Sequence, residues 1–178
     1  GQYSYVIGGN ADREYFPDPG TISKHITEQT CESCNSYNML KLTRHLYAWK
    51  PEARLFDYYE RAHINHILAH QNPATGMFAY MVPLMSGSHR VWSEPFDDFW
   101  CCVGSGMESH AKHGESIWWE DADRPADMLI ANLYIPSEAD WAARGAKLRI
   151  ETGYPFDGHV AMSIPKLARA GRFTLALR

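Results

Sequence analysis

The chain has 178 residues, of which 45% are hydrophobic and 21% are charged, a balance typical of a globular protein with a packed core. Its net charge of −4 at pH 7 gives no electrostatic basis for binding nucleic acid. The sequence contains no run of 18 apolar residues, so no membrane-spanning segment is predicted. Aromatic residues make up 13%, which suits a carbohydrate-binding cleft or a large packed core, and composition alone favours the core.

Residues 1–34 are predicted to form a loop, because glycine and proline interrupt them repeatedly. Glu14 lies in this loop, between Arg13 and two aromatic residues. The residues alone favour a surface carboxylate paired with Arg13. A carboxyl group pressed against Tyr15 and Phe16 could instead have a raised pKa and act as a general acid.

Two helices are predicted to follow this loop. The first runs from Tyr37 to Trp49, and its apolar residues cover more than one face, which predicts burial on two sides. Pro51 ends this helix and opens a second one that extends to about Gln71. In the second helix, three histidines share one face without an acidic or sulfur partner, so they are predicted to be core or cleft-edge residues: His63, His66 and His70.

The next segments are predicted to be an extended stretch, Met77–Leu84, a loop to Phe96, a small-residue turn at Val103–Gly106, and a helix from about Gly106 to Trp119. Beyond Asp121–Pro125, which reads as a linker, the periodicity changes to that of strands. Helices followed by strands predict two domains joined near residue 125. The expected strands are Met128–Ile135, Lys147–Thr152, His159–Ile164 and Arg172–Leu177.

The four cysteines occur as two close pairs, Cys31 with Cys34 and Cys101 with Cys102. A redox CxxC is disfavoured, because the βαβ context of such motifs is missing. Disulfides within either pair would require an oxidising compartment. A zinc site is the third interpretation, and Glu32 adds an oxygen ligand to the thiols, although the spacing departs from that of a zinc ribbon. A cysteine-rich site with a carboxylate is unusual for a structural zinc and indicates a thiolate with a chemical role.

Four motifs occur in order along the chain: E-S-C-N-S-Y-N-M-L-K-L-T-R-H-L, D-Y-Y-E-R-A-x-x-N-H-I-L, M-V-P-L and F-W-C-C-V-G-S-G-M-E-S-H. Together they resemble glycoside hydrolase family 127 and its relative family 146, the β-L-arabinofuranosidases, from about Gly8 to the C-terminus. The resemblance implies a mainly α fold, in which residues 1–125 form part of an (α/α)6 barrel. It also implies that residues 126–178 are the first strands of an all-β sandwich domain, and that the chain is a fragment, inactive by itself.

The resemblance further implies the chemistry of the site. Zinc would be held by Glu32, Cys34, Cys101 and Cys102. Cys101 would be the nucleophile and Glu14 the acid/base of a retaining glycosidase that releases β-L-arabinofuranose. The implied partner is an L-arabinofuranosyl oligosaccharide or glycan.

Tyr80, in A-Y-M-V-P-L, matches a substrate-binding tyrosine of the family. Two residues depart from the family pattern. Cys31 lies outside its ligand set, which leaves open whether Cys31 or Cys34 supplies the third thiolate, and His63 stands where the family more often has an apolar residue. The competing interpretation is a non-catalytic domain with a structural cysteine-rich zinc site. No signal peptide is recognisable, and bacterial cytoplasm, periplasm and secretion are all compatible with the sequence.

Overall fold

A computed structural model of the protein describes residues 2–178. The chain divides into two compact units, of which the first ends at Lys112 and the second comprises residues 113–178. Within residues 2–178, the three α-helices belong to the first unit and the six strands to the second. Among the described residues, no helix combines the length and the apolar character needed to cross a membrane.

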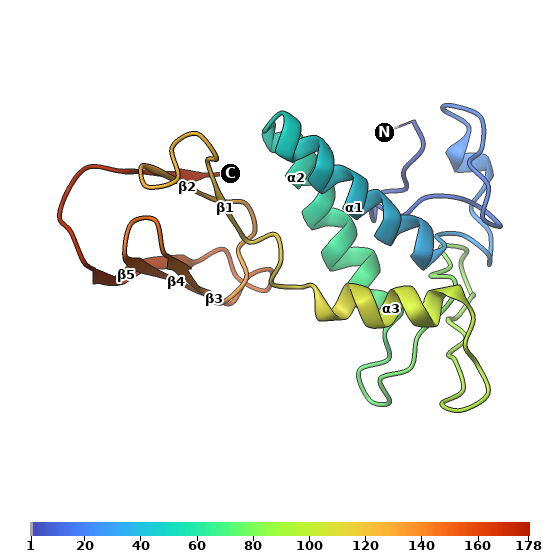
Figure 1. The fold of residues 1–178 in the computed structure, drawn as a ribbon. Helices are drawn as coiled ribbons and strands as arrows, with labels where there is room; N and C mark the ends of the chain where they lie inside the picture. Colours follow the sequence, from blue (N-terminus) through green and yellow to red (C-terminus); the bar gives the residue numbers. More distant parts are fainter. Residues whose placement is uncertain (1) are drawn as a thin grey trace. The chain divides into compact units, whose positions relative to one another are not determined.

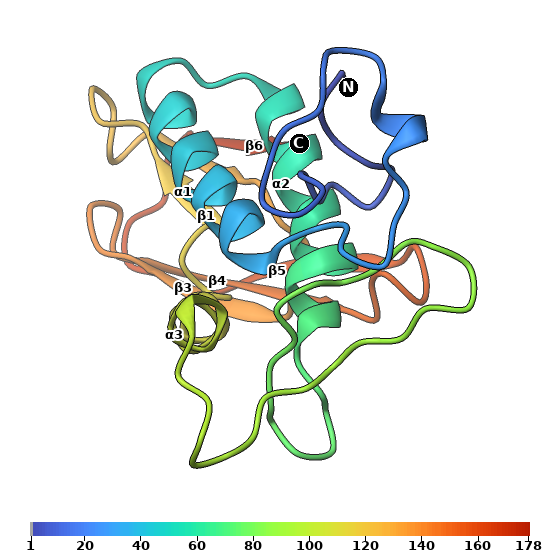
Figure 2. The ribbon, with the colours of Figure 1, turned by 90° about the vertical axis from the view of Figure 1, so that its right-hand side faces the viewer.

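The helices of the first unit are α1 (Ser33–Trp49), α2 (Ala53–Ala62) and α3 (Cys101–Ala111). α2 continues directly into a π-helical turn, His63–Ile67, and a 3-10 turn, Leu68–His70. The predicted second helix is therefore present as one helical run that changes its winding. α1 contacts both other helices, lying beside α2 in Figures 1 and 2, and Figure 2 looks along the axis of α3.

One face of α1 forms the core of this unit. Tyr47 packs edge-on against Phe56 of α2, with ring centroids 4.6 Å apart, and Phe56 is fully buried. Burial of such large side chains removes apolar area from water at about 25 cal/mol per Å². Burial on two sides was predicted for this helix, but three of its apolar residues are exposed: Leu42, Leu46 and Trp49.

The rest of the first unit consists of two long irregular stretches, residues 2–32 and 71–100, with one 3-10 turn at Ile22–Lys24. Isolated β-bridges align short pieces of these stretches. Asp12 pairs with Thr30, and Glu32 pairs with Met81. The predicted extended stretch 77–84 is thus held by bridges rather than by a regular sheet.

The second unit contains two three-stranded sheets, ordered β1-β2-β6 and β3-β4-β5. β2 pairs with β1 in antiparallel and with β6 in parallel orientation, and the other sheet is antiparallel throughout. Leu129 of one sheet and Trp141 and Leu148 of the other share one buried cluster, so the two sheets pack together. The strands are β1 (Trp118–Glu120), β2 (Met128–Ala131), β3 (Ser137–Trp141), β4 (Ala146–Thr152), β5 (Val160–Leu167) and β6 (Thr174–Leu177).

The expectation of a mainly α fold was wrong. Helical residues make up 28% of the chain and extended residues 24%. Residues 71–100 contain proline, glycine and serine at short intervals and form bridged loops, and the strands lie in residues 118–177. The resemblance described the fold of much longer proteins, whereas the described residues 2–178 contain three α-helices.

The boundaries of α3 were also predicted wrongly. The helix was expected from about Gly106 to Trp119, but it begins at Cys101 and ends at Ala111, and Trp118 starts a strand. The Gly-Ser-Gly run had indicated a turn. Gly106 instead lies inside the helix, where a Cβ atom would stand 2.7 Å from the ring of Phe78, so glycine here permits close packing. The strand Ser137–Trp141 was not predicted at all.

Candidate metal and active site

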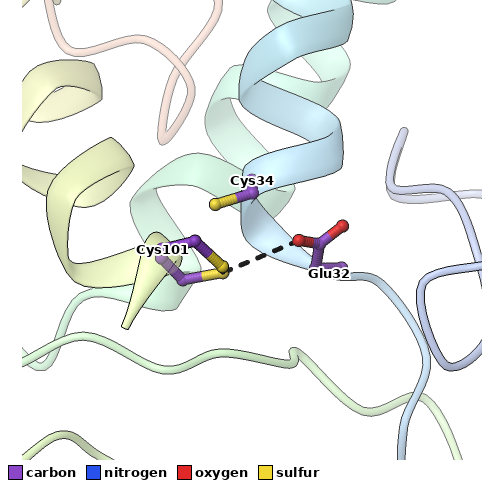
Figure 3. A group of neighbouring side chains, drawn as sticks. Glu32, Cys34 and Cys101 are labelled. Carbon is purple, nitrogen blue, oxygen red and sulfur yellow. Dashed lines mark hydrogen bonds between the residues drawn. The ribbon is translucent and has the colours of Figure 1, made fainter. Parts of the chain in front are cut away.

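Four potential metal ligands meet where α1 and α3 begin. One ligand atom from each of Glu32, Cys34, Cys101 and Cys102 lies within 4.8 Å of the others. Figure 3 shows Glu32 and Cys34 at the start of α1 pointing toward Cys101 at the start of α3. The structure therefore brings together residues that are about 70 positions apart in the sequence, in an arrangement that could hold a metal ion.

The three thiols occupy the first turns of their helices. Cys34 is the second residue of α1, and Cys101 and Cys102 are the first two residues of α3. Neither helix has a side chain that caps its first amide groups. The positive end of each helix dipole favours negative charge at this position.

Contacts within the cluster are consistent with thiols that share one centre. The sulfurs of Cys101 and Cys102 are 3.8 Å apart, and the Cys102 sulfur lies 4.0 Å from a carboxylate oxygen of Glu32. All four cysteines of the chain are free thiols. The Cys34 sulfur also lies 2.9 Å from the hydroxyl of Ser105.

Ser105 was missed in the sequence because its segment was interpreted as a turn. In a helix that starts at Cys101, Ser105 is four residues on and therefore lies on the same face. A correct helix start would have identified it as a neighbour of the thiols.

The pKa values of the four groups show that burial and mutual repulsion disfavour more than one negative charge in the cluster. Burial, followed by the nearby charges of Cys34 and Glu14, raises the pKa of Glu32 to about 7. A hydrogen bond from Cys102 and another from Ser105 lower the pKa of Cys34 to about 6. The pKa of Cys102 is raised, chiefly because it donates to Cys34, and burial raises the pKa of Cys101. A bound cation would lower these pKa values, because a nearby positive charge stabilises the ionised forms of the thiols and of the carboxyl group.

A second group of side chains joins this cluster through Tyr80. The Tyr80 hydroxyl donates a hydrogen bond to the Glu14 carboxylate, and the Cys101 thiol donates to the same hydroxyl at 3.4 Å. These contacts raise the pKa of Tyr80, with Cys101 as the larger cause and Glu14 as the next. The indole of Trp100 packs against the phenol ring, with centroids 5.3 Å apart. Glu14 is therefore hydrogen-bonded to Tyr80, and Tyr80 connects it to the cysteine cluster.

Backbone strain is concentrated next to the group formed by Glu14, Tyr80 and Cys101. Among residues 2–178, the non-glycine residues with positive φ are Ala11, Arg13, Glu14 and Cys31. Their values lie between 50° and 71°, in the left-handed region that L-residues rarely occupy. All four belong to two segments that run beside each other through the bridge between Asp12 and Thr30. Such strain persists only where surrounding contacts enforce it, and it is common at functional sites.

Cys31 lies outside the cluster, although it is adjacent to Glu32. Its side chain is fully buried among apolar residues that include Tyr5 and Val82, and burial raises its pKa to about 12. The group of side chains that could hold a metal ion thus contains Cys34 and not Cys31.

The three histidines of the second helical run are buried and are not part of the cluster. The Nδ1 atom of His66 lies 2.7 Å from the Ser36 hydroxyl, and His70 stacks on Phe78 with centroids 5.3 Å apart. The prediction of core rather than ligand histidines is confirmed by this burial.

Comparison with known proteins assigns both parts of the chain. Residues 1–115 match the profile of the β-L-arabinofuranosidase GH127 catalytic domain, and residues 128–178 match the profile of the GH127 middle domain. No protein of curated function matches the chain.

Solved structures share the fold at low sequence identity. A GH127 β-L-arabinofuranosidase from Geobacillus stearothermophilus T6 is 23% identical, with a TM-score of 0.75 over 99% of this chain and 29% of its own. The GH127 β-arabinofuranosidase BT3674 is 22% identical, with a TM-score of 0.76 over 99% of this chain and 27% of its own. This chain thus spans less than a third of the length of these two proteins. Because the catalytic-domain profile covers well over half of its residues, the chain belongs to glycoside hydrolase family 127.

Proposed function

We propose that this chain carries the catalytic residues of a retaining β-L-arabinofuranosidase, with Cys101 as the nucleophile and Glu14 as the acid/base. The observation that supports this most directly is the position of the Tyr80 hydroxyl, which contacts both the Glu14 carboxylate and the Cys101 sulfur. A nucleophile and a proton donor therefore flank one point, as a double-displacement glycosidase requires. Family membership supports the substrate class, an L-arabinofuranosyl oligosaccharide or glycan.

We further propose that the metal is zinc, held by Glu32, Cys34, Cys101 and Cys102. A donor set of three thiolates and one carboxylate binds zinc in preference to magnesium or calcium. The 3.8 Å between the Cys101 and Cys102 sulfurs is about the separation of two thiolates bonded at about 2.3 Å to one tetrahedral ion. When bound, zinc keeps the coordinated thiols deprotonated near neutral pH.

In the first step, the Cys101 sulfur attacks the anomeric carbon of the arabinofuranose. The bond between that carbon and the leaving oxygen breaks, and Glu14 donates its proton to this oxygen. The products are an alcohol and a sugar attached to Cys101 through a thioether. Tyr80 lies close enough to both groups to hydrogen-bond the sugar, which is the substrate-binding role that we propose for it.

In the second step, the Glu14 carboxylate accepts a proton from water while the water oxygen attacks the anomeric carbon. The carbon–sulfur bond breaks, arabinose leaves, and Cys101 is again a thiolate. Each displacement inverts the anomeric centre, so two in sequence retain the configuration. The exposed positions of Glu14 and Cys101 allow substrate and water to reach them.

We assign catalysis and the zinc site to the part of residues 1–125 that forms the first unit, and a separate β domain to residues 126–178 together with β1, which pairs with β2. We also propose that residues 1–178 alone are inactive. Apolar side chains of α1 such as Trp49, which is 80% exposed, have no cover in this chain. The chain is also less than a third as long as the two named enzymes that it resembles.

The test compares Cys101→Ser and Glu14→Gln with a matched carboxylate control, Glu120→Gln, in the full-length protein. Glu120 is exposed in the second unit. Glu14→Gln should keep zinc content and melting temperature while activity on natural linkages falls by about 10²–10⁴-fold, the usual contribution of general acid–base catalysis. Cys101→Ser should abolish turnover. Wild-type activity in Glu14→Gln would instead leave the cluster as a structural metal site.

A further inference from the structure

The hydroxyl of Ser105 lies 2.9 Å from the sulfur of Cys34. This distance is shorter than the 3.4 Å between the Cys101 sulfur and the Tyr80 hydroxyl, and shorter than the 3.8 Å between the sulfurs of Cys101 and Cys102. Ser105 and Cys34 are both half-buried, so their contact is partly shielded from water. A polar side chain outside the group of potential ligands therefore makes a close contact with one of them.

This contact joins two helices. Ser105 is the fifth residue of α3, whereas Cys34 is the second residue of α1. Residues four apart in a helix share one face, so Ser105 lies on the same face of α3 as Cys101. α3 thus carries two of the proposed ligands together with the hydroxyl group that contacts the cysteine of the other helix.

Hydroxyl groups of other helical residues in this unit make a different kind of bond. Ser109 of α3 donates to the carbonyl of Gly106 at 3.1 Å. Thr43 of α1 donates to the carbonyl of Met39 at 2.7 Å. Bonds to a carbonyl three or four residues earlier are common for serine and threonine in helices. The hydroxyl of Ser105 instead contacts a sulfur of another helix.

The backbone next to both contacting residues is held by one short segment, residues 78–79. A Cβ atom at Gly106 would lie 2.7 Å from the Phe78 ring, so α3 lies directly on that ring. At the start of α1, the hydroxyl of Ser33 donates to the carbonyl of Ala79 at 3.2 Å. Gly106 and Ser33 are direct sequence neighbours of the two contacting residues. The hydroxyl and the thiol are therefore presented from supported positions, as a metal centre requires of its surroundings.

The direction of the bond follows from the chemistry of a metal-bound cysteine. A cysteine that coordinates zinc has lost its proton, so its sulfur can only accept a hydrogen bond. A serine hydroxyl has one O–H group to donate, and a bond to a charged acceptor is about twice as strong as a bond between neutral groups. With a metal bound, the hydroxyl of Ser105 would therefore donate to the sulfur of Cys34.

We propose that Ser105 is a positioning residue of the metal centre, which holds the side chain of Cys34 in its coordinating orientation through this hydrogen bond. The proposal rests on the metal site proposed above and adds to it a residue that is not a ligand. Loss of such an outer partner typically lowers metal affinity by about 10–100-fold.

The experiment measures the dissociation constant for zinc of the full-length protein, by equilibrium competition with a chromophoric chelator. Ser105→Ala removes the hydroxyl. Ser105→Val and Ser105→Thr introduce side chains of the same shape, of which only the second keeps a hydroxyl. Ser109→Ala is the matched control, because Ser109 bonds within its own helix. The dissociation constant should rise about 10–100-fold in Ser105→Ala and Ser105→Val, and should keep its wild-type value in Ser105→Thr and Ser109→Ala.

Cobalt(II) in place of zinc gives a second readout, the charge-transfer absorption from thiolate to metal. A hydrogen bond lowers the energy of the sulfur lone pairs, so its loss should move this band to longer wavelength in Ser105→Ala and Ser105→Val. A role of Ser105 in helix packing alone would leave the band unchanged.

Wild-type zinc affinity together with an unchanged band in Ser105→Ala and Ser105→Val would overturn the assignment of Ser105. Equal weakening in Ser105→Val and Ser105→Thr, or in Ser105→Ala and Ser109→Ala, would overturn it as well. If Ser105→Ala does not fold, the two variants of equal shape decide. Failure of the metal site itself is recognised separately, because the wild type would then bind zinc no more tightly than Cys34→Ala. In that case the assignment of Ser105 fails with it.

Discussion

The backbone amide of Cys31 donates a hydrogen bond of 3.1 Å to the carbonyl of Ala11. Both residues have positive φ, 62° for Cys31 and 71° for Ala11. This bond joins the segment that carries Glu14 to the segment that carries Glu32 and Cys34. On the other side, the amide of Ser33 donates to the Tyr80 carbonyl at 3.0 Å. One short stretch of backbone thus positions the proposed acid, the tyrosine and two of the proposed metal ligands relative to one another.

Cys31 is predicted to position the site without binding metal. Cys31→Ala keeps the backbone bonds and removes a buried sulfur from an apolar cluster, so it should lower the free energy of unfolding by about 1 kcal/mol. Metal content should stay at one ion per chain, because the sulfur is outside the cluster. Cys34→Ala serves as the comparison and should reduce metal content, measured by atomic absorption on the full-length protein. Equal loss of metal in both variants would place Cys31 among the ligands.

Gly106 and Gly104 form a matched pair within α3. A Cβ atom at position 106 would lie 2.7 Å from the Phe78 ring, whereas at position 104 it would meet nothing within 4 Å. Gly106→Ala should therefore destabilise the protein by about 1–3 kcal/mol, the usual cost of overpacking. Gly104→Ala should be neutral or stabilising by up to about 1 kcal/mol, because alanine favours the helix. Denaturant midpoints of the two variants check this, and equal midpoints would contradict the packing of α3 on Phe78.

Acid should destabilise the protein through its buried histidines. Burial lowers the pKa of His66 from its ordinary value of 6.5 to about 4, and that of His70 to about 3. The unfolded chain therefore binds protons below pH 6.5 that the folded chain does not bind, and stability falls as the pH decreases through this range. At pH 5 the loss is roughly 2 kcal/mol for each histidine.

The measurement for this prediction is the urea midpoint at pH 7.5 and at pH 5. The wild type should lose stability between these values, and His66→Gln should lose less because one of the depressed groups is gone. His45→Gln, at an exposed position, should behave like the wild type. An acid sensitivity that is the same in all three proteins would assign the effect to other groups.

Local sequence signals predicted the parts of the fold that depend on neighbouring residues. The helical periodicity of residues 37–49 and the break at Pro51 correspond to α1 and the start of α2. The same kind of signal failed at α3, where a Gly-Ser-Gly run was read as a turn although Gly106 lies inside the helix and permits close packing against Phe78. The short strand Ser137–Trp141 was missed because its stability comes from pairing with β4 and not from its own residues.

The candidate site could not be derived from local patterns. About 70 residues separate Cys34 from Cys101, and no periodicity brings them together; only the resemblance to a known family predicted that they would meet. The link between Glu14 and Tyr80 is likewise invisible in the sequence, because it depends on β-bridges between distant loops. The residues alone had favoured a surface carboxylate at Glu14. The resemblance also led to the wrong expectation of a mainly α chain, since the fold of a long protein need not describe each of its parts.

The measurement that tests the central claim most directly is mass spectrometry of trapped protein. Full-length Glu14→Gln is mixed with an aryl β-L-arabinofuranoside, whose leaving group needs little protonation, and the reaction is quenched with acid. Loss of the base slows the second step, so one pentosyl group should accumulate on the peptide that carries Cys101. A pentosyl group on Glu32 or on another residue, or no adduct together with wild-type turnover, would contradict the assignment of Cys101 as the nucleophile.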